Sequence, residues 1–141
     1  MRIRIVATLV AIAAGVFISV ACGHSGSSDE GKTIKSASVG DTTVTLSSAS
    51  GELKQGENTL TLSFTDSSGK AVDVPAASLK FHMPAMGSMA EMSDVAALTT
   101  TALHGKFQAA VNIESAGTWE AMISFQGPRG TEQATMSINV K

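Results

Sequence analysis

Four of the seven methionines lie in one short segment at a constant spacing of three. The segment reads FHMPAMGSMAEM (81–92), and the four residues are Met83, Met86, Met89 and Met92. A thioether has no proton to lose and is polarizable, so clustered thioethers favour Cu(I) or Ag(I) over Zn(II), Mg(II) or Ca(II). The pattern therefore predicts a soft-metal site, with Cu(I) as the expected ion.

Two histidines are candidates to complete this site. His82 lies within the methionine segment, and His104 falls on a turn that could approach it in a folded sheet protein. Imidazole is a ligand that copper accepts readily. We therefore include His82 and His104 in the predicted ligand set, although the sequence does not show that they are adjacent.

The segment 84–92 is expected to be a loop, with room for one helical turn. Pro84 lacks a backbone donor and disfavours helical geometry at Met83. In a straight helix, side chains three residues apart point in directions that differ by about 60°, since 3.6 residues make one turn. A single helix would not bring all four sulfur atoms together, whereas an irregular loop could.

Three other interpretations of the methionines stay open. The side chains could plug the open end of the fold, because methionine fills irregular gaps well. They could form an apolar patch that docks a partner protein, or act as sacrificial traps for oxidants. Met136 shares the parity of a buried strand face and is expected in the core, whereas the role of Met122 is not defined by the sequence.

The N-terminus predicts export. Arg2 and Arg4 precede an apolar run that ends in small residues, which is the layout of a cleaved signal peptide over 1–21. The end of this run, ISVAC, resembles the bacterial lipoprotein signal, which implies that Cys22 carries lipid. An uncleaved N-terminal anchor is the alternative. Residues 22–32 then form the lipidated cysteine and a flexible tether, and the protein is expected outside the cytoplasm, on the periplasmic face of a membrane or at the cell surface.

Composition excludes several classes of function. Cys22 is the only cysteine, so the exported domain can build no disulfide, thiolate zinc site or blue-copper centre. Without residues 1–21 the chain has eight basic and twelve acidic residues, a net charge of −4, which argues against nucleic acid as a partner. No paired carboxylates or Ser-His-Asp arrangement is evident. We expect neither an enzyme nor a small-molecule substrate.

Residues 33–141 are long enough for one domain, and the distribution of turn residues between their short apolar segments is typical of an all-β chain. Alternating apolar and polar residues predict about seven strands, and turn signals separate them every 8 to 15 residues. We expect an immunoglobulin-like antiparallel β-sandwich in which Trp119 is a core residue. The expected strands cover 42–49, 58–65, 78–83, 95–101, 106–113, 118–125 and 133–140.

Short motifs occur in a fixed order along the predicted domain. They are a G-x-N run, an aspartate-glycine turn, a Met-Pro-x-Met loop, and two strand starts of the forms G-x-aromatic and G-x-W. The residues that form them are Gly56, Asn58, Asp66, Gly69, Met83, Pro84, Met86, Gly105, Phe107, Gly117 and Trp119. In this order and spacing the motifs resemble the YtkA-like family of small exported bacterial domains. Phe107 stands where the family often has Tyr, and Ser88 lengthens the loop before Met89.

The resemblance implies an immunoglobulin-like sandwich and an association with copper handling, since similar domains occur beside copper-efflux components. Combined with the methionines, it predicts a membrane-anchored lipoprotein that binds Cu(I) for storage, delivery or efflux. Its expected partners are the membrane, through Cys22, and a copper-efflux or other envelope protein. The alternative is an interaction module that binds no metal and docks an envelope complex through the same apolar loop.

Overall fold

The computed structural model describes residues 31–141, which form nine β-strands and no helix. None of the described residues thus belongs to a helix that is long and apolar enough to cross a membrane. The predicted signal peptide, Cys22 and most of the tether lie outside the described residues. The strands are β1 (Lys32–Val39), β2 (Thr42–Ser48), β3 (Gly56–Asp66), β4 (Ala77–Met83), β5 (Met92–Val95), β6 (Ala97–Thr100), β7 (Lys106–Ile113), β8 (Gly117–Gly127) and β9 (Gly130–Val140).

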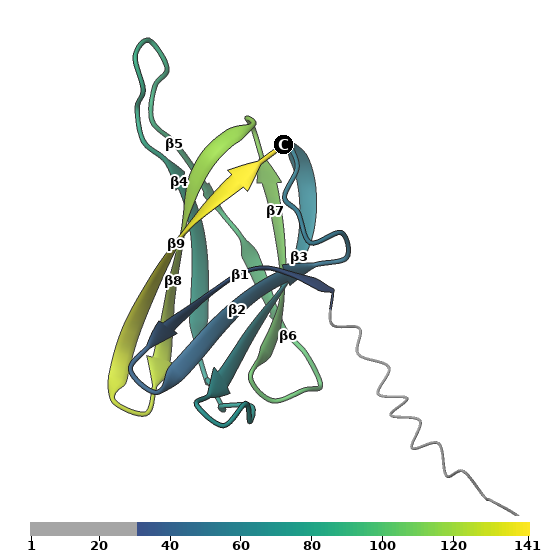
Figure 1. Cartoon of the computed structure of the whole chain (residues 1–141), viewed down its shortest axis with the longest axis vertical. Coiled ribbons are helices and arrows are strands. Elements are labelled where there is room, and N and C mark those ends of the chain that lie inside the picture. Colours follow the sequence, from purple (N-terminus) through teal and green to yellow (C-terminus); the bar gives the residue numbers. More distant parts are fainter. Residues whose placement is uncertain (1–30) are drawn as a thin grey trace, which may run out of the picture.

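Two antiparallel sheets face each other as a sandwich (Figure 1). One has the strand order β1-β2-β3-β7-β6 and the other the order β5-β4-β8-β9. Without β1 and β5, these orders are those of strands A-B-E-D and C-F-G of a constant-type immunoglobulin domain. The prediction of an all-β, immunoglobulin-like antiparallel sandwich is confirmed.

Strict alternation along the strands builds the core. Strand β7 alternates buried and solvent-facing residues over its whole length, and β8 and β9 follow the same period of two. Trp119 is fully buried, and its indole Nε1 donates a hydrogen bond to the carbonyl oxygen of Ser115 at 2.9 Å. Met136 is 3% exposed, so both residues are structural, as expected. Because this core is built from 31–141, we expect the chain from residue 23 onward to fold on its own.

Two strands were missing from the prediction of about seven. Strand β1 begins at Lys32, the last residue of the predicted tether, and pairs with β2 at the edge of its sheet. Strand β5 is the second missing strand: it pairs with β4 and contains only Val95 of the predicted strand 95–101, whereas β6 lies within that prediction and pairs with β7. Ala96 lies at the crossing point, where its N–H donates to the carbonyl oxygen of Leu79 at 3.0 Å.

Candidate metal and docking site on the β4–β5 hairpin

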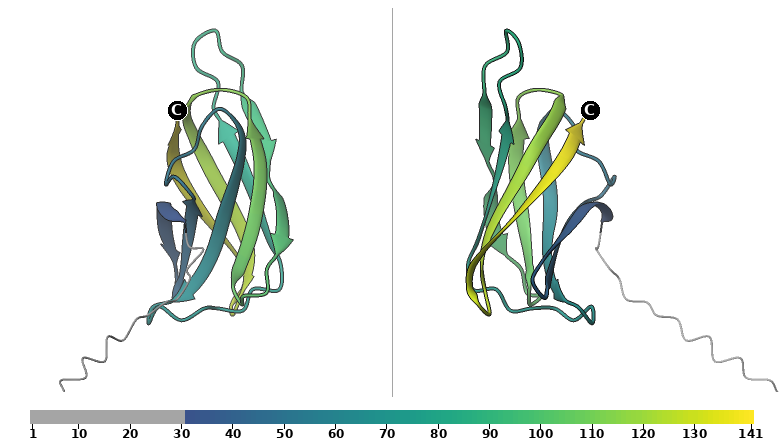
Figure 2. Two further views of the ribbon diagram at one scale, coloured as in Figure 1. Left: turned by 90° about the vertical axis from the view of Figure 1, so that its right-hand side faces the viewer. Right: turned by 60° about the vertical axis from the view of Figure 1, so that its left-hand side comes forward.

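The methionine segment is a β-hairpin that continues β4 and β5 beyond the body of the sandwich (Figures 1 and 2). Met83 faces Met92 at its base, where the two strands pair. At its tip Met86 faces Met89, and each residue donates its N–H to the other's carbonyl oxygen, at 3.2 and 2.9 Å. The expected connection between two strands is confirmed, since residues 84–91 lie between β4 and β5, but the helical turn is wrong, because a two-residue turn and a bridge between Met86 and Met89 form the tip.

Hairpin symmetry explains the spacing of three. The turn consists of Gly87 and Ser88, and Gly87 has a φ of 59°, a conformation that glycine adopts without strain. The register set at Met83 and Met92 is unchanged at Met86 and Met89. The four methionines are thus two facing pairs placed symmetrically about one turn.

The two pairs have different environments. Met83 is 6% exposed and belongs to the core, and Met92 packs against that core. Met86 is 65% exposed and Met89 47% exposed. Side chains alternate between faces along a strand, so an offset of three residues also directs the two pairs to opposite faces of the hairpin. A single site formed by all four sulfur atoms does not follow from this geometry.

Met83 is held in place by the start of β8. Its Cε atom lies 2.6 Å from the position that a Cβ atom on Gly117 would occupy. Gly117 has a φ of 137°, which L-residues rarely adopt. The end of the Met83 side chain thus packs closely against the backbone of Gly117, and the plug interpretation describes Met83 well.

His82 lies at the base of the hairpin between two carboxylates. Its Nε2 atom is 3.0 Å from Glu91 Oε1, and its Nδ1 atom is 3.9 Å from Glu120 Oε2. Because the carboxylates approach different ring nitrogens, the three groups do not converge on one point. His82 is also four residues from Met86, about 13 Å along a strand. The structure therefore does not bring His82 into the Met86–Met89 pair.

His104 lies at the end of the domain opposite the hairpin, so it cannot share a site with the methionines. It lies in the connection between β6 and β7, and the chain runs away from the hairpin through β5 and β6 to reach it (Figure 1). The expectation that His104 approaches His82 is wrong. Within residues 31–141 there is also no cluster of three or more histidine, cysteine, aspartate or glutamate residues that could hold a metal ion.

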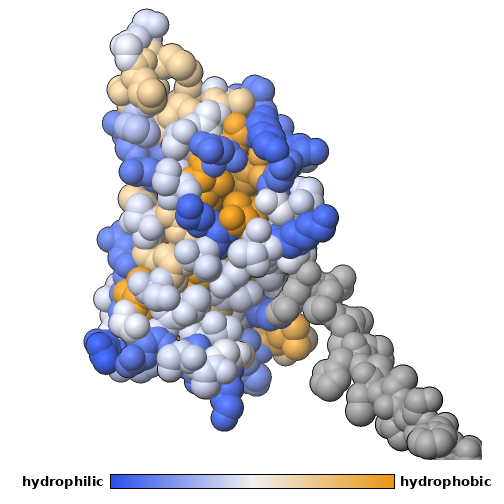
Figure 3. Space-filling model, viewed as in Figure 1, coloured by the Kyte–Doolittle hydropathy of each residue, from blue (hydrophilic) through white to orange (hydrophobic). Residues whose placement is uncertain are grey.

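The hairpin tip is apolar as well as prominent. Pro84, Ala85 and Ala90 are exposed together with Met86 and Met89. The space-filling view shows a mildly hydrophobic surface over this projection (Figure 3). Exposed apolar groups on a projecting element are typical of contact surfaces, so the geometry fits a soft-ion site or a docking element at the same place.

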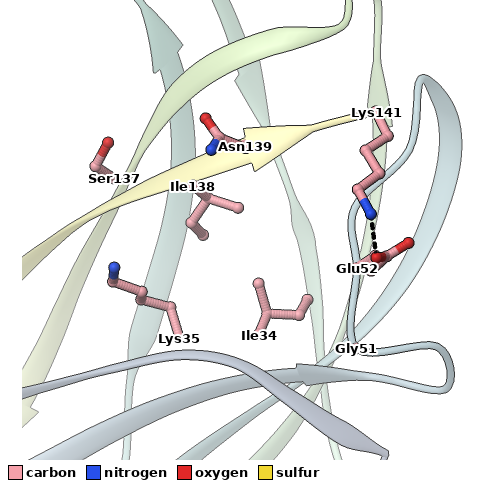
Figure 4. A pocket seen from close by; sticks show the side chains of 8 residues that line it. All are labelled: Ile34, Lys35, Gly51, Glu52, Ser137, Ile138, Asn139 and Lys141. Carbon is pink, nitrogen blue, oxygen red and sulfur yellow. Dashed lines mark hydrogen bonds and ion pairs between the residues drawn. The ribbon is translucent and has the colours of Figure 1, made fainter.

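A separate cleft of about 240 Å³ lies between β1 and β9 (Figure 4). Ile34 and Ile138 line its opposite walls, and an ion pair between Lys141 and Glu52 lies at one end. The hydrogen bond from Lys141 and its positive charge lower the pKa of Glu52. We assign the cleft no role, since its walls combine two isoleucines with an ion pair that already satisfies both of its charges.

Most residues behind the family resemblance have a structural explanation. Asn58 holds its turn through Nδ2, which donates to the carbonyl oxygens of Lys54 and Gly56. A Cβ atom on Gly105 would lie 2.4 Å from the carbonyl oxygen of Val72, so only glycine fits there. By contrast, Pro84 and Met86 are exposed, and packing does not account for them.

Comparison with known proteins identifies the family. No curated protein and no solved structure matches the chain. The YtkA-like family model matches residues 36–124, which is more than half of the chain and includes the hairpin. The chain therefore belongs to the YtkA-like family.

Proposed function

We propose that this domain binds Cu(I), or a similar soft ion, at the tip of the β4–β5 hairpin and passes it to a partner. The observation that carries the proposal is the facing pair of exposed thioethers, Met86 and Met89. Two residues that exchange both backbone hydrogen bonds have Cα atoms about 5.5 Å apart and side chains on the same face. Two flexible thioethers placed this way can reach one ion.

The small number of ligands favours delivery or efflux over storage. Met86 and Met89 are neutral and soft, which suits a monovalent soft ion. The buried Met83 and the carboxylate-paired His82 are not available at the tip. An ion bound there keeps open coordination positions, and ligands of an acceptor protein can occupy them. Transfer then needs no unfolding of the sandwich.

We further propose that lipid on Cys22 holds the domain outside the cytoplasm at a membrane surface. Residues 23–31, between this cysteine and β1, would let the domain move relative to the membrane. A hairpin that projects from a tethered domain can reach an envelope protein such as a copper-efflux component. The proposal assigns binding and no catalysis to the chain.

Docking without metal is the second candidate, and the apolar surface around the tip favours it. Pro84, Ala85 and Ala90 add contact area that a metal site would not require. In this case an envelope complex would receive the hairpin in an apolar groove, and the thioethers would serve as adaptable contacts.

A titration of residues 23–141 with Cu(I), against a chromophoric Cu(I) chelator under reducing conditions, separates the two functions. Metal binding predicts one ion per domain, lost in the variant M86L/M89L. The control M122L changes a methionine on the outer face of β8, which lies between Lys80 and Thr135 in the body of the sheet, and should retain uptake. Equal uptake by all three proteins, or uptake by none, would refute the metal proposal.

The same variants test docking. Leucine keeps the apolar surface but removes the soft ligand, so docking predicts that M86L/M89L still binds its envelope partner. The variant M86K/M89K should lose that partner, because two charges would have to be desolvated at the contact.

A further inference from the structure

The methionines of the described domain differ sharply in their access to solvent. Met86 and Met89 are 65% and 47% exposed, Met92 and Met122 are partly buried, and Met83 and Met136 are 6% and 3% exposed. Oxidation of methionine follows this access. We propose that Met86 and Met89 form a modification site that two-electron oxidants convert to sulfoxides while the sandwich stays folded.

The chemistry requires only an oxidant such as hydrogen peroxide. A sulfur lone pair attacks one peroxide oxygen, an S–O bond forms and the O–O bond breaks. Sulfur loses two electrons, and the leaving hydroxide takes up the proton of the hydroxyl group transferred to sulfur. One peroxide oxygen therefore ends in the sulfoxide and the other leaves as water. The product is a polar, chiral sulfoxide, which methionine sulfoxide reductases return to the thioether.

The hairpin tip can accept this change because its side chains carry none of its structure. The tip is held by the two backbone hydrogen bonds between Met86 and Met89, and both side chains already extend into water. The buried methionines are the opposite case. A sulfoxide at Met83 would place a polar group against Gly117 within the core, where burying it without a partner is unfavourable.

Oxidation would also regulate the tip, and this consequence rests on the proposed function. A sulfoxide is a harder and weaker ligand for a soft ion than a thioether, so the oxidised tip should release Cu(I) or Ag(I). An ion bound through one sulfur lone pair withdraws electron density from that sulfur and makes it a weaker nucleophile toward the oxidant. Metal binding should therefore slow oxidation of Met86 and Met89, and oxidation should weaken metal binding.

Hydrogen peroxide treatment of residues 23–141 with time-resolved peptide mass spectrometry tests the site. We expect Met86 and Met89 to oxidise several-fold faster than Met83 and Met136, with the near-ultraviolet circular dichroism of Trp119 unchanged. A methionine sulfoxide reductase should then reverse the modification. Uniform oxidation of all methionines in the folded domain, or unfolding that accompanies oxidation of the tip, would overturn the inference.

Ag(I), which peroxide does not oxidise under these conditions, separates this inference from the proposed function. If both hold, Ag(I) slows oxidation of Met86 and Met89 and leaves Met92 and Met122 unaffected. Selective oxidation that Ag(I) does not slow supports the modification site and contradicts the metal site. Unselective oxidation contradicts the modification site whatever Ag(I) does.

Discussion

Truncation of one methionine from each pair should affect different properties of the domain. Met83→Ala removes a side chain that is 6% exposed, and Met86→Ala removes one that is 65% exposed. Burial of the first predicts a loss of about 2–5 kcal/mol in the free energy of unfolding, the usual range for methionine truncated in a core. The second should change that free energy by less than about 0.5 kcal/mol.

Urea unfolding followed by Trp119 fluorescence measures the difference. With a mid-range slope of about 2 kcal/mol per molar urea for a small domain, Met83→Ala should lower the midpoint by roughly 1–2.5 M. The midpoint of Met86→Ala should stay close to that of the unmodified chain. In metal titrations the variant with the larger effect is the other one: only Met86→Ala should lose metal uptake. Equal midpoints for the two variants would refute the division of the methionines into a core pair and a tip pair.

Three further predictions concern the hairpin's supports and the turns. Gly117→Ala should destabilise the domain by about 1–3 kcal/mol, mainly because alanine is strained at a φ of 137°, and Met83 Cε would also have to move away from the new Cβ atom. An unchanged thermal unfolding temperature in this variant would contradict the requirement for glycine at this position. His82→Ala should retain Cu(I) uptake in the chelator competition, since His82 faces carboxylates rather than the tip; loss of uptake by the folded variant would make it a ligand. The hydroxyl of Ser68, and then the N–H of Lys70, donate hydrogen bonds that lower the pKa of Asp66. Its charged form therefore stabilises the fold above the unfolded-state pKa of about 3.9, and this contribution is lost as the pH falls through the lower folded-state pKa. In a plot of unfolding free energy against pH, Asp66→Asn should reduce the fall at acidic pH, and an unchanged fall would count against the role of this turn.

The sandwich was predictable because its central strands alternate cleanly. In β3, Leu60, Leu62 and Phe64 are buried between hydroxyl residues, and the same rule placed Trp119 and Met136 in the core. Period-two alternation has one physical cause, a strand with one face in the core, so it seldom misleads over eight residues.

Strands at the sheet edges were harder to predict. Strand β1 is mostly exposed and has few apolar residues to set a period. In β5, Asp94 occupies the position opposite the buried Phe81, and aspartate is disfavoured in strands. An acidic residue at an inward-facing position therefore concealed β5, which begins at the last residue of the methionine segment.

The sequence predicted which residue types form the candidate site but not how they are arranged. The methionines indicated a preference for soft ions, yet their common spacing suggested one cluster of four. The sequence signal that could have divided them is Gly87-Ser88, a two-residue turn centred between Met86 and Met89, which favours a hairpin. The positions of His82 and His104 depend on how the two sheets pack, which local sequence does not encode.

Nuclear magnetic resonance of the methionine methyl groups, recorded while Ag(I) is added to residues 23–141, tests metal binding at the tip most directly. We predict that the ε-methyl signals of Met86 and Met89 shift together and saturate at one ion per domain, while those of Met83 and Met136 stay in place. Signals that do not move, or shifts at the buried methionines instead, would contradict a soft-ion site on the hairpin.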